Sequence, residues 1–444
     1  MERSRKVSFI YIVILICVSL FTSCNKVDSS INKPIGEFIP VLRFSVASDV
    51  HIEDDEKSIK EEERLAKLFE ISYKRSESNA TNYNKLDAAL FVGDFTNLGT
   101  LVSMQKFKRI IDDNIKNETE LVVSLGNHEF FSDGDAVIGR YKEVFNKEVD
   151  EHFKINGFHF IKLSPNGEYF SDDKVNWLKK ELSIASKDTP SLPIFVMQHQ
   201  HIRNTVYGST AWSVDNLYDV LKDYPQVVDF SGHSHFPIID ERSLWQGDFT
   251  AIGTGTLSYT EMGLNGVANE YIFPYGEEGD YKYLVPSGER DYAVFQIVEV
   301  DRLGNIRLIG YDLISNTELF TRYIYTPHLK DSFITNDMKK EESSILEFKV
   351  GSEIKVINED DETTSLLIPQ AECMNSIESY RADIYENGVL KNNCYALSGY
   401  IINPTPKDIK IRLGKLDITK EYIVKVYAVN AYGLCLKNPL IIEV

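Results

Sequence analysis

The chain has almost no cysteine outside its two ends. Five of its 444 residues are cysteines, and they are Cys17, Cys24, Cys373, Cys394 and Cys435. A metal site within residues 25–372 therefore has no thiolate ligand and must use imidazole, carboxylate or amide groups. The three late cysteines allow one disulfide and one free thiol, and the sequence does not select the pair.

Basic residues are in the minority. The chain has 48 Lys and Arg against 67 Asp and Glu, which gives a formal net charge of −19. An acidic surface repels the nucleic-acid backbone, so we expect no nucleic-acid polymer as a partner. A small phosphate ester held by local metal charge remains compatible with this composition. No protein partner is identifiable from the sequence.

The N-terminal apolar run is too short to cross a membrane. It covers residues 7–21, whereas a spanning helix needs about 20 apolar residues. Arg3, Arg5 and Lys6 precede it, and Thr22-Ser23-Cys24 follows it, which resembles the lipobox of bacterial lipoproteins. We expect a lipoprotein signal peptide at 1–23, a polar tether at 24–39, and export to the bacterial cell envelope with a lipid anchor at Cys24. An uncleaved N-terminal anchor is the alternative.

Short apolar runs alternate with helical patterns in the first two thirds of the chain. Such runs suit strands buried on both faces, and they cover residues 41–48, 88–92, 121–125, 194–197 and 227–230. Apolar spacings of three and four predict helices at 58–73 and 104–115. This alternation indicates an α/β fold. Residues 291–300 and 306–312 favour a more antiparallel portion.

A charged stretch at 329–345 predicts a linker, and short strands with turn signals follow it. Leu416 lies six residues before Tyr422, and an alternating strand follows. This pattern resembles the tyrosine corner of fibronectin type III domains. We expect an α/β domain at 40–328 and a small all-β sandwich of fibronectin type III type at 346–444. On this division, we expect a chain ending near Lys340 to fold and to keep most of the activity of the first domain.

Each apolar run in the first domain ends in residues that commonly bind metals. These endings are Asp49-Val50-His51, Gly93-Asp94, Gly126-Asn127-His128-Glu129, His199-Gln200-His201 and Gly232-His233-Ser234-His235. Ligands of open α/β sheets bind beyond the carboxyl ends of strands, so these five ends are expected to converge. Six histidines of the nine in the chain lie in these clusters; strand-end polar residues that merely cap loops would not be expected in this order.

This series of motifs resembles the calcineurin-like metallophosphoesterase family over about residues 40–325. The resemblance implies a four-layer α/β/β/α sandwich, a dinuclear metal centre with a bridging hydroxide nucleophile, and hydrolysis of a small phosphate ester. One ion would take Asp49, His51, Asp94 and His235. The other would take Asp94, Asn127, His199 and His233, and His128 would be the uncoordinated catalytic histidine.

Elementary chemistry supports the same interpretation. Two ions about 3.5–4 Å apart can activate a water and neutralise phosphoryl oxygens. Imidazole, carboxylate and amide ligands suit Mn, Fe, Zn or Ni, and do not select among them. The sequence leaves open whether His199 or His201 is the ligand, and whether Glu129 orients His128 or pairs elsewhere.

Two other functions are considered. A purple-acid-phosphatase-like monoesterase would have a Tyr ligand directly after the Gly-Asp segment, where this chain has Phe95. A non-catalytic envelope binding or adhesion lipoprotein with a vestigial metal domain would be expected to have lost ligands, and none is missing.

Overall fold

The computed structural model describes residues 37–78, 83–210, 212–263, 271–272, 291–342, 346–373, 376–401 and 404–444. The expected signal peptide, Cys24 and most of the tether lie outside these residues. Residues 32–444 form one compact unit. No helix within the described ranges is both long and apolar enough for a membrane span.

Residues 40–328 are the expected catalytic domain, or catalytic region. Its first sheet has six strands in the order β16-β15-β14-β1-β2-β3. In chain order they are β1 (Pro40–Ala47), β2 (Ala88–Val92), β3 (Glu120–Ser124), β14 (Val294–Asp301), β15 (Ile306–Asp312) and β16 (Thr317–Ile324). Strands β1, β2 and β3 are parallel, whereas β14 to β16 extend the sheet antiparallel. All five residues of β2 are buried, as its continuous apolar run predicts.

The second sheet also has six strands, in the order β10-β11-β9-β6-β5-β4. They are β4 (Glu151–Ile155), β5 (Phe158–Lys162), β6 (Ile194–Met197), β9 (Val227–Ser231), β10 (Leu244–Gln246) and β11 (Thr250–Gly253). Strands β5, β6, β9 and β11 are parallel, and β4 and β10 form antiparallel edges.

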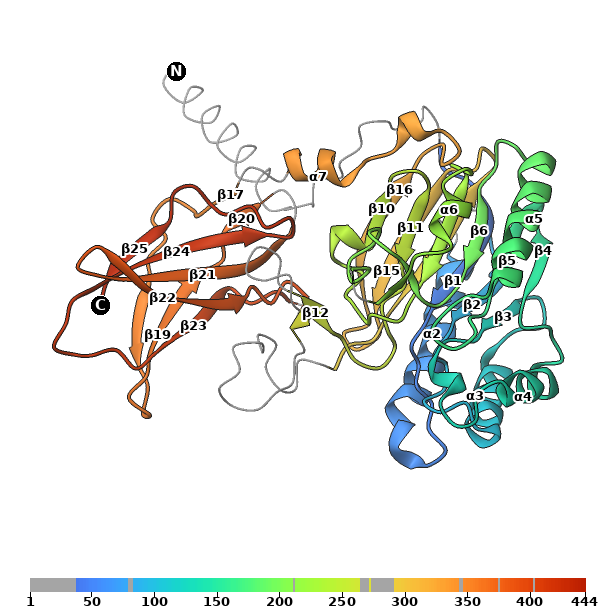
Figure 1. The fold of residues 1–444 in the computed structure, drawn as a ribbon, viewed down its shortest axis with the longest axis horizontal. Helices are drawn as coiled ribbons and strands as arrows, with labels where there is room; N and C mark the ends of the chain where they lie inside the picture. Colours follow the sequence, from blue (N-terminus) through green and yellow to red (C-terminus); the bar gives the residue numbers. More distant parts are fainter. Residues whose placement is uncertain are drawn as a thin grey trace, which may run out of the picture. The chain divides into compact units, whose positions relative to one another are not determined.

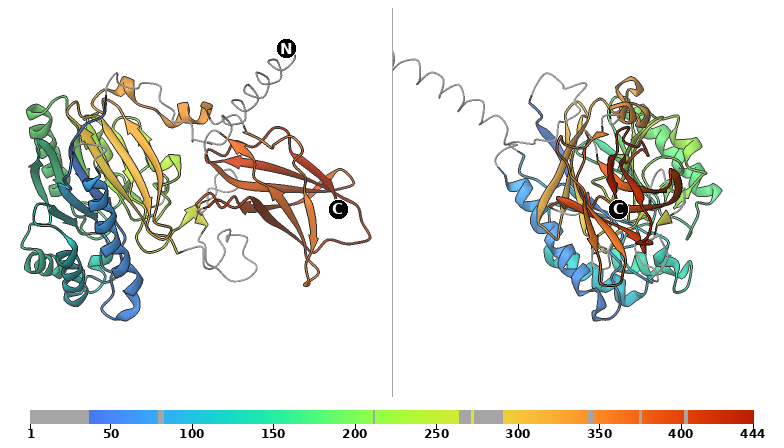
Figure 2. Two further views of the ribbon diagram at one scale, coloured as in Figure 1. Left: turned by 180° about the vertical axis from the view of Figure 1, so that it is seen from behind. Right: turned by 90° about the vertical axis from the view of Figure 1, so that its left-hand side faces the viewer.

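The two sheets pack face to face around an aromatic core (Figure 1). Phe44 of β1 meets Phe160, Phe195 and Phe230 of the second sheet edge to face, at centroid distances of 5.4, 5.1 and 5.9 Å. Helices cover the outer faces (Figure 2): α2 (Ile59–Glu77), α3 (Leu101–Asn114) and α4 (Ala136–Phe145) on the first sheet, α5 (Asp172–Asp188) and α6 (Tyr218–Leu221) on the second. The expected four-layer α/β/β/α sandwich is thereby confirmed.

Helix α3 shows how local sequence sets these layers. Thr100 caps its N-terminus by accepting a hydrogen bond from the Ser103 amide at 3.1 Å, which is a favoured capping geometry. Met104, Phe107 and Ile111 are fully buried, because a spacing of three and four residues puts them on one face. The cap explains why the helix begins three residues before the predicted start at residue 104.

The C-terminal region is all-β. One sheet has the order β18-β19-β23 and the other β22-β21-β24-β25, and one apolar core includes residues of both. The strands are β18 (Lys355–Asn358), β19 (Thr364–Pro369), β21 (Ile377–Glu386), β22 (Val389–Leu397), β23 (Asp408–Gly414), β24 (Tyr422–Asn430) and β25 (Leu440–Glu443). Cys394 and Cys435 form no disulfide in the described part of the chain.

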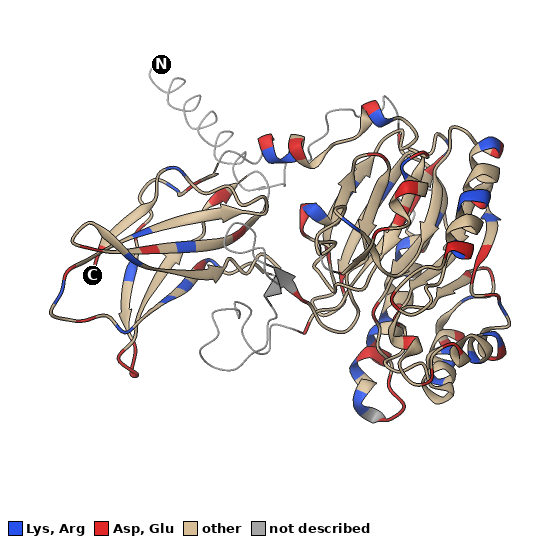
Figure 3. Cartoon of the chain, in the orientation of Figure 1, with Lys and Arg blue, Asp and Glu red and all other residues tan. Residues whose placement is uncertain are grey.

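The segment expected as a linker contains a short helix, α7 (Asn336–Glu342). Lys339 of this helix donates a hydrogen bond to the Glu241 carbonyl at 2.9 Å, so the segment is attached to the catalytic region. Charged side chains of both signs are interspersed along α2 to α5 (Figure 3). These four helices carry 14 Lys and Arg against 12 Asp and Glu, so the negative net charge of the chain lies outside them.

Candidate metal centre

All seven expected metal ligands lie in loops that follow the carboxyl ends of strands. Asp49 and His51 follow β1, Asp94 follows β2, Asn127 follows β3, His199 follows β6, and His233 and His235 follow β9. Parallel strands present their carboxyl ends at one edge. The structure therefore brings together, at one edge of the sandwich, side chains that are up to 186 residues apart in sequence, as in Asp49 and His235.

The backbone at these loops adopts an uncommon conformation. Asp49, His51, Asp94, His233 and His235 have φ values of 53°, 55°, 49°, 71° and 57°. Each such non-glycine residue costs on the order of 1–3 kcal/mol, and such residues cluster at functional sites.

Glycines allow the loops to approach one another closely. A Cβ added to Gly126 would lie 2.2 Å from Asp94 Oδ1, and one added to Gly232 would lie 2.4 Å from Asp49 Oδ2. A larger residue at either position would therefore push a carboxylate out of place.

The atoms of the expected metal ligands form two adjoining clusters. Asp49, His51 and His235 make one, and Asp94, His199 and His233 make the other, each with its ligand atoms within 4.8 Å of one another. His128 belongs to a third group of the same kind, with His51 and Asp94. His51 Nε2 and Asp49 Oδ1 each lie 3.1 Å from His235 Nε2. Asp94 Oδ2 lies 2.9 Å from His199 Nε2. His199 Nε2 is also 3.9 Å from Asp49 Oδ1, so the clusters are contiguous.

Backbone carbonyls fix the tautomers of two histidines that are expected ligands. His199 Nδ1 lies 2.8 Å from the Val92 carbonyl, and His235 Nδ1 lies 3.0 Å from the Tyr259 carbonyl. A carbonyl only accepts, so each Nδ1 carries a proton and each Nε2 faces the cluster. Asn127 Oδ1 is buried and has no hydrogen-bond partner. A buried oxygen without a donor fits a cation site, and the imidazole, carboxylate and amide set fits a transition-metal pair.

The electrostatics of the cluster favour ionised carboxylates, neutral His51 and His233, and a protonated His199. Burial raises the pKa of Asp49, but His235 outweighs it, and the pKa falls to about 2. Burial and the neighbouring His235 lower the pKa of His51 to about 3, and burial and His199 do the same for His233. Burial lowers the pKa of His199, but Asp94 outweighs it, and the pKa rises to about 10. The two carboxylates thus hold positive charge that a metal cation can replace.

His128 shares a group of close ligand atoms with His51 and Asp94, and it also contacts the neighbouring backbone. Its backbone amide donates to Asp94 Oδ1 at 2.9 Å, and its Nδ1 lies 3.1 Å from the Asn97 carbonyl. Its Nε2 is 3.9 Å from Asp94 Oδ2, and the side chain is 25% exposed. A carbonyl only accepts, so Nδ1 carries a proton and Nε2 is the nitrogen that faces Asp94.

Glu129 pairs elsewhere and does not orient His128 through any hydrogen bond of its own. It is fully buried on the short 3₁₀ helix η3 (His128–Phe130). Its carboxylate accepts hydrogen bonds from the amides of Asp94, Gly126 and Thr96 at 3.0, 2.7 and 2.8 Å. Glu129 therefore ties together the loops that follow β2 and β3.

His201 lies outside both clusters. Its Nδ1 is 2.8 Å from Ser231 Oγ and its Nε2 is 2.7 Å from Ser234 Oγ, so serine hydroxyls occupy both nitrogens. Arg203, which follows on the same loop, pairs with Asp215 at the surface.

Several residues around the centre had no sequence signal. The Trp212 ring lies 5.3 Å from His233, the Tyr259 ring 4.3 Å from His235, and the Phe131 ring 4.4 Å from His128. Asn97 and Glu168 contact His128 and Asn127. Most of these contacts join residues 20 or more positions apart, and no local pattern marks them.

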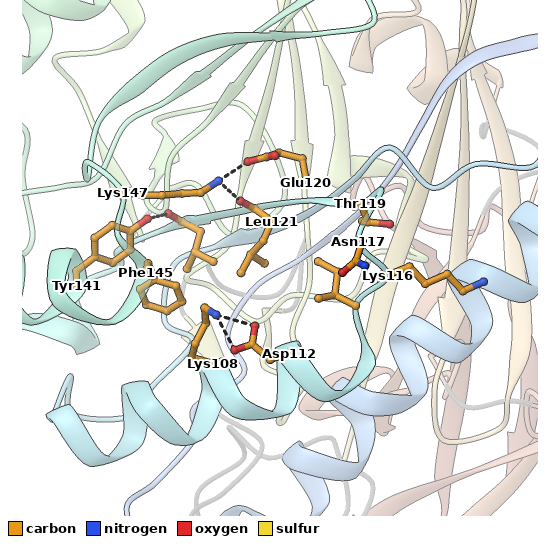
Figure 4. Close-up of a pocket in the computed structure, with 12 residues that line it drawn as sticks. Lys108, Asp112, Lys116, Asn117, Thr119, Glu120, Leu121, Tyr141, Phe145 and Lys147 are labelled. Carbon is orange, nitrogen blue, oxygen red and sulfur yellow. Dashed lines mark hydrogen bonds and ion pairs between the residues drawn. The ribbon is translucent and has the colours of Figure 1, made fainter.

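A cavity of about 340 Å³ lies at the other end of β3, away from these residues (Figure 4). Its charged side chains are paired: Lys108 contacts Asp112 at 2.6 Å, and Lys147 contacts Glu120 and the Leu121 carbonyl. Glu120 and Leu121 are the first two residues of β3, and Asn127 follows the other end of that strand, so this cavity is separate from the expected metal ligands.

Comparison with known proteins agrees with this geometry. Residues 42–237 match the model of the calcineurin-like phosphoesterase family, which identifies a calcineurin-like phosphoesterase domain in that part of the chain. No curated protein matches the sequence.

Three solved structures are similar at low identity. Purple acid phosphatase PPD1 from yellow lupin (Lupinus luteus) seeds has 11% identity and a TM-score of 0.44 over 67% of this chain and 56% of its own. PhoD has 12% identity and a TM-score of 0.38, over 66% and 73%. Vps29 of Chaetomium thermophilum has 12% identity and a TM-score of 0.27, over 66% and 100%. The chain thus spans little more than half the length of the lupin enzyme.

Proposed function

We propose that this protein hydrolyses a small phosphate ester at a dinuclear metal centre. The observation that carries the proposal is the pair of adjoining clusters, Asp49, His51 and His235 beside Asp94, His199 and His233. Such a set, buried at the carboxyl edge of an α/β sandwich, matches the requirements of two-metal hydrolysis. The match of residues 42–237 to the calcineurin-like phosphoesterase family supports the same class of reaction.

The residues divide naturally between two ions. Asp49, His51 and His235 would hold one, Asn127, His199 and His233 would hold the other, and Asp94 would serve both because a carboxylate has two oxygens. When bound, two Mn, Fe, Zn or Ni ions supply charge for the phosphoryl oxygens and an activated water for attack at phosphorus.

The chain's own groups orient the site and move the proton. Asp94 Oδ1 is held by the His128 amide at 2.9 Å, and the carboxylate of Asp49 by the His233 amide at 3.1 Å. His128 Nε2 is within reach of solvent, and we assign it the proton that the leaving oxygen receives. A positioned general acid of this kind contributes about 10²–10⁴ in rate.

A purple-acid-phosphatase type of centre is disfavoured by Phe95. This residue is fully buried, and its ring packs 4.8 Å from Phe107 and 5.6 Å from Phe145. Phe95 therefore packs in the apolar core, at the sequence position where purple acid phosphatases have a tyrosine ligand.

The test is turnover of phosphomonoesters and phosphodiesters by the full chain reconstituted with Mn, Fe or Zn. We expect metal-dependent release of phosphate or alcohol from at least one class of ester. His51→Gln should lose metal and activity together for every substrate. Absence of turnover in a protein with two bound ions per chain would overturn the proposal and favour a non-catalytic binding lipoprotein.

We further propose that the chain is exported and held at the bacterial envelope by a lipid on Cys24. The basic start, short apolar run and Thr22-Ser23-Cys24 ending support this location. The C-terminal region at 346–444 is proposed to be a fibronectin type III-like sandwich, after a catalytic domain at 40–328. Its three-stranded and four-stranded sheets and the buried Tyr422 support that assignment.

A further inference from the structure

Glu168 contacts a metal ligand from a loop that carries no ligand itself. The side-chain amide of Asn127 donates a hydrogen bond from Nδ2 to Glu168 Oε1 at 2.9 Å. At the other end of the same amide, Oδ1 is buried and has no hydrogen-bond partner. The two ends of one side chain thus face very different surroundings.

The Glu168 carboxylate determines which end of the Asn127 side-chain amide faces the cluster. The oxygen and nitrogen of an asparagine amide have nearly the same shape, so packing alone does not distinguish the two orientations. Glu168 accepts hydrogen bonds and has none to donate when ionised. It therefore selects the orientation in which Nδ2 faces outward and Oδ1, the only atom of Asn127's side chain able to bind a cation, faces the buried cluster.

The loop that carries Glu168 is itself held in place. The Gly167 carbonyl accepts a hydrogen bond from Gln200 Nε2 at 2.8 Å, and Gln200 directly follows His199. Within the loop, the Asn166 amide donates to the Tyr169 carbonyl at 2.7 Å. The loop is thus tied to two ligand-bearing segments, those of Asn127 and His199.

We propose that Glu168 is a positioning residue, which orients Asn127 for the ion that Asn127 and His199 share. This inference rests on the proposed dinuclear centre. Glu168 is exposed, so its charge is screened and direct attraction to the ion is small. Its effect comes from orienting the ligand and from a charge-assisted hydrogen bond that draws electron density onto Oδ1.

The test measures metal affinity instead of turnover. Metal-free full-length protein is titrated with Mn²⁺ by calorimetry, for the wild type, Glu168→Ala and Glu168→Gln. Loss of such an outer partner typically weakens metal binding about 10–100-fold. We expect that loss for one of the two ions in Glu168→Ala, no change for the other, and a smaller loss in Glu168→Gln, whose amide oxygen can still accept.

Two controls separate positioning from a general charge or folding effect. Glu118 is an exposed glutamate near the amino end of β3, and Glu118→Ala should leave both affinities unchanged. In an Asn127→Asp background both side-chain oxygens can bind metal, so no orienting partner is needed, and adding Glu168→Ala should cause no further loss.

The outcomes distinguish this inference from the proposed function. Wild-type affinity for both ions in Glu168→Ala, or an equal loss in the Asn127→Asp background, overturns the positioning role alone. Wild-type protein that binds two ions without hydrolysing any ester overturns the proposed function, while the affinities still decide the role of Glu168. Wild-type protein that binds a single ion overturns both.

Discussion

Arg242 and Glu378 form a buried ion pair, with 2.7 Å between Arg242 Nη2 and Glu378 Oε1 and side chains only 7% and 0% exposed. Arg242 lies in the catalytic region and Glu378 on β21 of the C-terminal region. Asp240 holds the same guanidinium, from Nε to Oδ1 at 2.8 Å, and accepts from the Tyr400 hydroxyl at 2.7 Å. The C-terminal region therefore contributes partners to charges buried in the catalytic region.

This pair bears on the expectation that a chain ending near Lys340 folds and keeps most of its turnover. Removing one partner of a buried pair typically costs about 3–5 kcal/mol. Arg242→Met leaves two carboxylates without their partner and should lower the free energy of unfolding by about that amount. Glu378→Ala should cost less, because Asp240 still pairs with Arg242, and truncation at Lys340 should destabilise at least as much as Glu378→Ala.

Urea denaturation of the full chain measures these differences. The matched control is Glu372→Ala, which removes an exposed pair with Lys349 whose side chains are 56% and 69% exposed. Exposed pairs contribute about 0–1 kcal/mol. Equal stability of Arg242→Met and the control would show that the buried network does not stabilise the fold.

Asp94→Ala should lose most of both metal ions. The two Asp94 oxygens contact different partners, the His128 amide at 2.9 Å and His199 Nε2 at 2.9 Å, and the carboxylate lies between the clusters. His233→Ala removes one ligand of one ion and should mainly deplete that ion. Metal analysis of the purified proteins should find close to two, none and one ion per chain. A fully active wild type with one ion contradicts this assignment.

His128→Gln should lower turnover about 10²–10⁴-fold while metal content stays normal. Gln has a similar volume and is polar, but it does not supply a proton for the leaving oxygen. The rate loss should shrink for esters with good leaving groups such as nitrophenolate, which need little protonation. Release of a metal ion by this variant would make His128 a ligand, and unchanged turnover of poor leaving groups would make it a bystander.

Asp229→Asn should stabilise the protein increasingly as the pH rises. Asp229 is fully buried on β9, and burial raises its pKa to about 8, whereas the unfolded value is about 3.9. The folded state therefore holds a proton that the unfolded state releases between these values. The contribution of Asp229 to stability is complete below the unfolded pKa and is lost as the pH rises towards 8.

Thermal unfolding at pH 5, 6.5 and 8 measures the effect of this substitution. The neutral amide does not titrate, so the difference in melting temperature between Asp229→Asn and the wild type should widen at each step. A constant difference across the three values would mean that Asp229 ionises in the folded protein at an ordinary pKa.

Cys24→Ala should move the protein out of the membrane fraction in a bacterial host. A lipidated cysteine with more than one acyl chain gives firm attachment, and its loss leaves no comparable anchor. Fractionation with a salt wash, followed by immunoblotting, measures the change. Salt-resistant attachment of a processed Cys24→Ala variant would contradict lipid anchoring at this residue.

The sequence alone determined where the strands and the polar loops at their ends lie. Residues 88–92 and 194–197 were predicted as strands and form β2 and β6 with those bounds. Burial on both faces demands a continuous apolar run, and this signal is local. The metal-binding residue types at the strand ends are equally local, because each cluster spans only a few neighbouring positions.

Only the tertiary structure distinguished the roles of residues that are neighbours within one sequence motif. In one continuous strand, His199 and His201 would point to the same side. However, β6 ends at Met197, and His201 begins a separate short strand, β7 (His201–Ile202). The alternation of side chains along β6 therefore does not extend to these two histidines. Glu129 turns inward because η3 directs it towards amide groups of Asp94 and Thr96, 33 or more residues away in sequence. Such contacts form only when loops that are far apart in the sequence pack against each other. A local pattern of residues contains no information about that packing.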